Sequence, residues 1–223
     1  MELWHGSSQM VREPMLELCR PWNDYGAGFY CTPHEELACE WASREAGQAA
    51  FANHYEIDEE GLSVLDLSSK EYSVLNWLAI LLENRVFQPG FPITYAGSDY
   101  VREHFLIDTQ PFDLIRGWRA DDSYFSFARA FINNQISVEQ LGRAMKLGGL
   151  GIQVMVKSPK AFGRIKFIEA PKVDTVAYSA KRIARDEQAR AEYREMQSVP
   201  DLKGVYLRDI LAEEMTNDDP RLR

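Results

Sequence analysis

Two segments near the start of the chain, taken in their order, constrain its fold more than any other feature of the sequence. The first is Leu3-Trp4-His5-Gly6-Ser7, and the second is the Gly-rich segment Asp24-Tyr25-Gly26-Ala27-Gly28-Phe29-Tyr30-Cys31-Thr32. The large apolar residues of the first suit a buried strand. The glycines of the second permit a sharp turn before an apolar run. With a helical pattern following over residues 33–46, the order predicts a strand, a loop, a short strand and a helix.

The predicted helix has local signals at its start. Thr32 is the expected N-cap, Pro33 occupies the first helical position, and Glu35 can complete a capping box. Leu37 and Trp41, four positions apart, then fall on one helical face. The helix therefore carries a tryptophan close to the Gly-rich segment.

Four residues of this region have the chemistry that a nicotinamide nucleotide requires. Tyr30 and Trp41 can hold the flat, cationic nicotinamide ring by stacking and cation–π attraction. The main chain of Gly6 can bond the carboxamide, and His5 can bond the ribose hydroxyls. Taken singly, such residues are more often structural than functional. Their combination predicts that Tyr30 and Trp41 flank one pocket with His5 at its rim.

The same combination resembles the NAD-binding half of ADP-ribosyltransferases of the His-Tyr-Glu type. In that family the histidine contacts the ribose and the tyrosine stacks on nicotinamide. The resemblance implies NAD as the substrate, no metal, and a set of cofactor-binding residues: His5, Gly6, Ser7, Tyr30 and Trp41.

Over nearly its full length the chain also resembles an uncharacterised bacterial family, domain of unknown function 3990. Beyond the two N-terminal segments, the pieces that carry this resemblance are Glu40-Trp41-Ala42, Asn84-Arg85, Phe112–Gly117 followed by Ala120-Asp121-Asp122, Gln153–Val156 and Tyr206–Ile210. Asn84 and Arg85 can bind phosphate, or they can form an exposed helix end.

The third motif of the resembled transferases places a glutamate where this chain has Gln153. An amide cannot act as a base or carry a full negative charge. Three explanations stay open. Gln153 supports a slower or different transfer, or a carboxylate of Asp121 or Asp122 enters the site, or the domain binds a nucleotide without chemistry. Asp122 also has a structural interpretation, as the N-cap of a helix from Ser123.

Composition indicates a globular protein. With 223 residues and 45% hydrophobic content, the chain can form one domain over 1–223, with a helical C-terminal extension from about 171 to 223. No apolar run reaches the roughly 20 residues of a membrane span, and no signal peptide is visible, so we expect a cytoplasmic protein without membrane contact.

The net charge of −9 argues against a general polyanion-binding surface. Three cysteines (Cys19, Cys31 and Cys39) are expected as free thiols rather than as zinc ligands.

The remaining pattern predicts an α+β fold like that of ADP-ribosyltransferases, with two small packed sheets and added helices. Strands are expected within 51–67, at 112–115, at 151–156 and, as a neighbour of the last, at 164–169. Helices are expected at 71–86, 123–134, 137–147, 178–196 and 205–215, and a loose tail at 217–223.

The resemblance implies NAD-dependent transfer of ADP-ribose to a macromolecule, protein or nucleic acid, or hydrolysis of NAD in its absence. A bacterial toxin, a toxin–antitoxin component with an antitoxin partner, or an anti-phage effector fits such an enzyme. The alternative is a catalytically silent module that binds a nucleotide or a protein partner.

Overall fold

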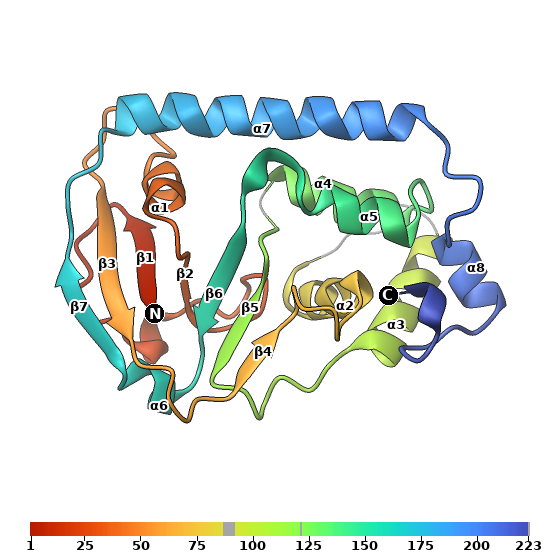
Figure 1. Ribbon diagram of the computed structural model, residues 1–223, viewed down its shortest axis with the longest axis horizontal. Coiled ribbons are helices and arrows are strands. Elements are labelled where there is room, and N and C mark those ends of the chain that lie inside the picture. Colours follow the sequence, from red (N-terminus) through yellow and green to blue (C-terminus); the bar gives the residue numbers. More distant parts are fainter. Residues whose placement is uncertain (87–91, 121, 223) are drawn as a thin grey trace.

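The computed structural model describes residues 1–86, 92–120 and 122–222, and it shows a mixed α+β architecture with two small sheets (Figure 1). A three-stranded antiparallel sheet has the order β1-β3-β7, formed by Glu2–Ser7, Phe51–Ile57 and Ile165–Glu169. A four-stranded sheet has the order β2-β6-β5-β4, formed by Phe29–Cys31, Ile152–Val156, Leu114–Trp118 and Val64–Asp66. Its pairs are antiparallel except for the parallel β4–β5 pair.

The two sheets meet where β1 passes β2. Trp4 N–H donates to Thr32 O at 2.7 Å, and Thr32 N–H donates to Trp4 O at 2.9 Å. Beyond this bridge the strands belong to different sheets. Between the sheets lies one part of the core, to which Leu3, Phe29 and Val154 contribute. The N-terminal prediction of strand, loop, short strand and helix is therefore confirmed in its order.

The helices gather mainly on one side of the four-stranded sheet (Figure 1). The helices of the described residues are α1 (Glu35–Ala42), α2 (Val74–Asn84), α3 (Pro92–Phe105), α4 (Asp122–Ile132), α5 (Val138–Ala144), α6 (Pro159–Phe162), α7 (Thr175–Ser198) and α8 (Leu207–Ala212). Helix α1 is an exception to this arrangement, since it packs on β1 and β3 of the three-stranded sheet (Figure 1). Short 3-10 turns lie at Leu16–Leu18, Leu147–Gly149 and Pro220–Leu222. Every residue of α2 from Val74 to Leu82 is buried, as expected of a helix that is apolar on nearly all sides. The largest core cluster surrounds it.

Helix α7 runs along the length of the molecule (Figure 1). It packs against α1 at one end and approaches α4 and the 3-10 turn at Leu147–Gly149 further along. The helix is highly charged, and only Thr175, Ser179 and Ala189 are buried on it. No helix in the described parts of the chain has the length and apolar character needed to cross a bilayer.

Four sequence-based expectations need correction. Helix α1 begins at Glu35, not Pro33, because Thr32 is still extended in its bridge with Trp4. The helix ends at Ala42, four residues earlier than expected. Its N-cap is His34, without a side-chain cap bond. Strand β7 pairs with β3, so it belongs to the other sheet from β6. Helix α3 was not predicted. The tail is not loose up to Leu222, which is buried and accepts a hydrogen bond from Ser73 Oγ at 2.6 Å.

Other boundaries agree closely with the sequence pattern. Ser137 caps α5 in a capping box with Gln140, as predicted. Helix α2, expected within 71–86, is capped by Ser73, a residue not singled out from the sequence. Helix α5 ends earlier than predicted, at Ala144 with Met145 as its C-cap. Gly148, the expected stop, lies beyond it in the 3-10 turn and has a φ of +62°. Strand β6 alternates as expected, since Val154 and Val156 face the core between the sheets while Met155 faces the core around α2.

Candidate functional site

A groove of about 1530 Å³ lies where β1, β2, α1 and the start of β6 come together. These elements lie side by side in the half of the molecule under the beginning of α7 (Figure 1). The loop over residues 8–23 forms one of its borders. We call this space the groove. Its lining includes six of the residues predicted from sequence: His5, Gly6, Ser7, Tyr30, Trp41 and Gln153.

Tyr30 enters the groove because strand alternation turns it away from its neighbours. Phe29 and Cys31 point into the core between the sheets, and Tyr30 points to the opposite side. The Tyr30 hydroxyl donates to Gly26 O at 2.8 Å and accepts from Tyr25 N–H at 2.9 Å. Burial raises the pKa of Tyr30, so the hydroxyl stays protonated. The ring is therefore fixed by the Gly-rich turn that precedes it.

His5 is held in one tautomer by the main chain of β2. Its Nδ1 lies 2.8 Å from Tyr30 O, and since a carbonyl only accepts, Nδ1 carries the hydrogen. Burial lowers the pKa of His5, although the bond to Tyr30 opposes this. A neutral His5 with Nδ1–H leaves Nε2 as a hydrogen-bond acceptor. The Phe29 ring lies 4.5 Å from the imidazole, centroid to centroid.

Gly6 lets helix α1 pack closely on β1, and its main-chain groups point away from β3. A Cβ at Gly6 would lie 2.0 Å from Ala38 O and 2.7 Å from Ala42 N, so only glycine permits α1 to pack this closely on β1. The group that approaches the Gly6 backbone is thus a helix of the same chain. The main-chain groups of Gly6 also point away from β3. Trp4, two residues earlier, bonds Thr32 on that side, and residues two apart on a strand are oriented alike.

The register supports this orientation of Gly6. Its partner on β3 is Ala52, whose N–H donates to Pro171 O at 3.1 Å on the far side of β3. The Gly6–Ala52 pair is therefore of the kind that exchanges no main-chain hydrogen bonds. The N–H and C=O of Gly6 accordingly face the groove.

Trp41 lies on α1 beside a cation. The guanidinium carbon of Arg119 is 4.1 Å from the centroid of the Trp41 ring, a cation–π distance. The indole Nε1 of Trp41 is buried without a hydrogen-bond partner. One ring face of Trp41 is thus covered by Arg119.

Gln153 lies at the start of β6 and is 4% exposed. Its Nε2 donates to Asp24 Oδ2 at 2.9 Å and to Trp118 O at 3.3 Å. Asp24 is buried too, and it pairs with Arg85 at 3.3 Å. Arg85 is the C-cap of α2, and its side chain, 35% exposed, forms this ion pair at the groove.

The described residues do not place Asp121 or Asp122, the other two predicted catalytic residues, beside Gln153. Asp121 lies outside the described residues. Asp122 begins α4, and its side chain is outside the description as well. The carboxylate that does adjoin Gln153 is Asp24, the first residue of the Gly-rich segment. This acidic residue beside the turn is visible in the sequence, but its position there gives no indication of a role.

The border of the groove carries exposed apolar residues that sequence reasoning missed. Met15, Leu18, Trp22 and Val86 line it with exposed fractions of 52%, 73%, 63% and 81%. Large apolar side chains gathered beside a groove are typical of contact surfaces.

Cysteine and metal chemistry have little support at this site. Cys19 lines the groove, but burial and the charge of Glu17 raise its pKa, which disfavours the nucleophilic thiolate. Cys31 and Cys39 are free and buried. Within residues 1–86, 92–120 and 122–222, no group of three or more His, Cys, Asp or Glu is placed to hold a metal ion.

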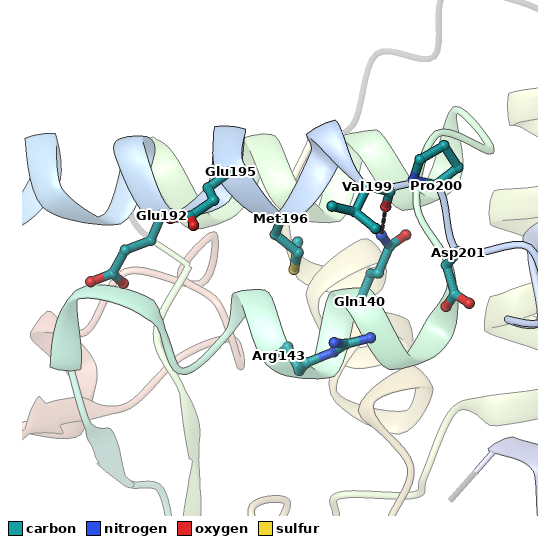
Figure 2. Close-up of a pocket in the computed structure, with 8 residues that line it drawn as sticks. All are labelled: Gln140, Arg143, Glu192, Glu195, Met196, Val199, Pro200 and Asp201. Carbon is teal, nitrogen blue, oxygen red and sulfur yellow. Dashed lines mark hydrogen bonds between the residues drawn. The ribbon is translucent and has the colours of Figure 1, made fainter.

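A second hollow, of about 490 Å³, lies between α5 and the end of α7 (Figure 2). Its carboxylates include Glu192, Glu195 and Asp201, with Arg143 on the opposite wall. Asp201 accepts hydrogen bonds from Ser137 Oγ at 2.6 Å and Gly204 N–H at 2.9 Å. This carboxylate fastens the α7–α8 connection to α5, and none of the residues predicted to bind NAD lies there.

The chain belongs to the family of proteins of unknown function DUF3990, whose model matches residues 1–167. The match spans nearly all of both sheets and the whole set of predicted site residues. No curated protein and no solved structure matches the chain closely enough to count as a relative.

Proposed function

We propose that this DUF3990 protein binds NAD in the groove and transfers its ADP-ribose to a macromolecule, or to water when no acceptor is present. The observation that carries the proposal is a convergence. Residues chosen for NAD from the sequence, on β1, β2, α1 and β6, line a single groove. An ADP-ribosyltransferase-like fold and a cytoplasmic location are parts of the same proposal.

The nicotinamide end of NAD fits the inner part of the groove. Its ring stacks on Tyr30, which the Gly-rich turn holds in place. Its carboxamide, which has both a donor and an acceptor, bonds the N–H and C=O of Gly6. The orientation of these main-chain groups toward the groove supports this placement.

The adjoining ribose is held by polar side chains on either side. His5 Nε2 accepts a hydrogen bond from a ribose hydroxyl, because Nδ1 is already bonded to Tyr30 O. Ser7 lines the groove next along β1 and offers a further hydroxyl. Arg119, stacked on Trp41, brings a positive charge toward the diphosphate.

In the reaction, the bond between ribose C1′ and the nicotinamide nitrogen breaks, and its electron pair leaves with nicotinamide. Positive charge develops on the ribose ring. An oxygen or nitrogen of the acceptor then bonds C1′, and its proton passes to solvent. The exposed apolar border formed by Met15, Leu18, Trp22 and Val86 supports a macromolecular acceptor. A toxin, toxin–antitoxin or anti-phage role, with an antitoxin as partner, fits this activity.

A catalytically silent nucleotide-binding or protein-interaction module is the second candidate. The observation in its favour is Gln153, an amide at the place where the resembled transferases carry a carboxylate. A silent module would keep the stacking and ribose contacts and lack the charge that stabilises the ribose as nicotinamide departs.

The two candidates separate in one experiment. Pure protein is incubated with NAD labelled in its ADP-ribose part, with and without a bacterial lysate, and nicotinamide release and the label are followed. Release with label on a macromolecule supports the transferase, and release without attachment supports NAD hydrolysis. NAD binding without release rejects both activities and supports the silent module.

A further inference from the structure

A buried carboxylate lies directly behind Gln153. Asp24 is 7% exposed and lines the groove. Its Oδ2 accepts from Ala120 N–H and from Gln153 Nε2, both at 2.9 Å, and its Oδ1 lies 3.3 Å from Arg85 Nη1. Three separate parts of the chain thus fix this carboxylate, and Arg85 offsets part of the cost of burying it.

The surroundings of Gln153 determine which way its amide points. Its amide nitrogen donates to the Asp24 carboxylate and the Trp118 carbonyl, which are both acceptors. The Tyr25 hydroxyl also lies within hydrogen-bond reach of Gln153, and it acts there as an acceptor because its own hydrogen is donated to Trp118 O. Only the amide nitrogen can bond these acceptors, because the reverse orientation would place the amide oxygen against other oxygens. The Oε1 atom of Gln153 is consequently the atom left to accept a hydrogen bond from a ligand.

We infer that Asp24 is a positioning residue for the transfer reaction, and that it supplies through Gln153 the negative charge that a glutamate would supply directly. This inference rests on the proposed function. A hydrogen bond to a carboxylate polarises the amide and increases the negative charge on its oxygen. The polarised Oε1 orients a ribose hydroxyl while positive charge develops at C1′, and the fixed charge of Asp24 stabilises the same state. Asp24 itself exchanges no proton or bond with the substrate.

The test compares four proteins: the parent, Asp24→Asn, Gln153→Glu and the double variant that carries both substitutions. Asp24→Asn should lower kcat for nicotinamide release about tenfold or more, with KM for NAD little changed, since the charge acts on the transition state. Gln153→Glu should also lower kcat, because two carboxylates would lie in contact and repel each other.

The double variant gives the decisive result. It exchanges the positions of amide and carboxylate, so the amide introduced at position 24 would donate to a carboxylate that now faces the ribose. We expect kcat to recover to the parent value or above. A residue with only a structural role would give losses that add in the double variant.

Asp113→Asn is the matched control. Asp113 is a second carboxylate with low exposure that accepts from Ser63 N–H at 2.9 Å and Ser158 Oγ at 2.5 Å, just before β5 and away from the groove. This variant should lose stability and keep the parent kcat. Circular dichroism checks the fold of every variant.

The outcomes that overturn the inference are distinct from those that overturn the proposed function. An active parent with an unaltered kcat in Asp24→Asn, or a double variant less active than either single variant, contradicts the role of Asp24 alone. A parent that binds NAD and releases no nicotinamide contradicts the transfer function, and the inference with it.

Discussion

Tyr30 and His5 show how single side chains of the groove are held in place by local hydrogen bonds. The Tyr30 hydroxyl is bonded on both sides within the Gly-rich turn, and its main-chain carbonyl holds His5. The two side chains most important to the proposed NAD site are therefore fixed by one short segment. Because their own hydrogen bonds set their orientation, little ordering is needed when a ligand binds.

Substitution of Tyr30 should separate stacking from positioning. Tyr30→Ala removes the ring and should weaken NAD binding by about 1 kcal/mol or more. Tyr30→Phe keeps the ring and loses the two bonds of the hydroxyl, so it should lower stability more than affinity. Calorimetric titration with NAD measures the first effect and urea unfolding the second. Tyr95→Ala, at an exposed tyrosine of α3, is the control and should alter neither. Equal NAD affinity in the parent and Tyr30→Ala would argue against stacking on this ring.

The lowered pKa of His5 predicts a dependence of stability on pH. In the unfolded chain the imidazole titrates near its ordinary pKa of 6.5, and in the folded protein at a lower pH because burial disfavours the charged form. Between these two values the unfolded chain binds more protons, so the free energy of unfolding falls as the pH drops below about 6.5. His5→Asn should weaken this dependence, measured by urea unfolding between about pH 5 and pH 7.5. An identical slope in the parent and the variant would show that His5 is not the group responsible.

At the scale of elements, the close packing of α1 on β1 sets the shape of the groove. Gly6 lets the helix backbone approach the strand, and the helix in turn carries Trp41 and Glu40 to the groove. The Thr32–Trp4 bridge fixes β2 beside the same strand. The positions of α1 and β2 around the groove thus both depend on β1.

Two glycine substitutions should have opposite effects. Gly6→Ala forces a Cβ against the backbone of α1 and should destabilise the protein by about 1–3 kcal/mol. Gly142→Ala, inside α5, meets no atom within 4 Å and should stabilise it by about 0.5–1 kcal/mol. Thermal unfolding measures both changes. A Gly6→Ala variant as stable as the parent would mean that α1 can shift without cost.

Local sequence signals predicted some elements well and others poorly, for physical reasons. Ser137 caps α5 together with Gln140, as predicted from local side-chain chemistry. Thr32 did not, because a long-range bridge to Trp4 kept it extended. The pairing of β7 with β3 rather than β6 depends on contacts between distant segments, which local periodicity does not encode.

For the groove, six of the eight predicted site residues line one space, and the side chains of the other two, Asp121 and Asp122, lie outside the described residues. The sequence did not identify Asp24 as the hydrogen-bond partner of Gln153, because the two residues are far apart along the chain. The apolar border at Leu18 and Trp22 was missed for a related reason: in sequence, an exposed apolar residue has the same appearance as a buried one.

At the scale of the whole molecule, α7 links the two halves. Arg185 of α7 bonds Glu40 of α1 at two positions, Nε to Oε2 and Nη2 to Oε1, both at 2.9 Å. The same guanidinium donates to Gly148 O at 2.8 Å. Glu40 is 1% exposed, so this ion pair fastens the long helix over the groove-forming elements.

Breaking this ion pair should be costly. Arg185→Met leaves the Glu40 carboxylate buried and unpaired, and should destabilise the protein by about 3–5 kcal/mol. Adding Glu40→Gln should recover part of the loss, because the remaining group is neutral. Urea unfolding of the parent, both single variants and the double variant measures the coupling. The exposed pair Arg190–Asp186 on the same helix is the control, and Arg190→Met should cost less than about 1 kcal/mol. Equal losses at Arg185 and Arg190 would contradict a fastening role for the Glu40 pair.

The most direct test of the proposed NAD site is a crystal structure of the protein grown with NAD. We expect electron density for nicotinamide stacked on Tyr30, with the carboxamide on the main chain of Gly6 and a ribose hydroxyl on His5 Nε2. Density for NAD in another place, such as the hollow between α5 and α7, or an empty groove at NAD concentrations that saturate the protein in solution, would contradict the proposed site.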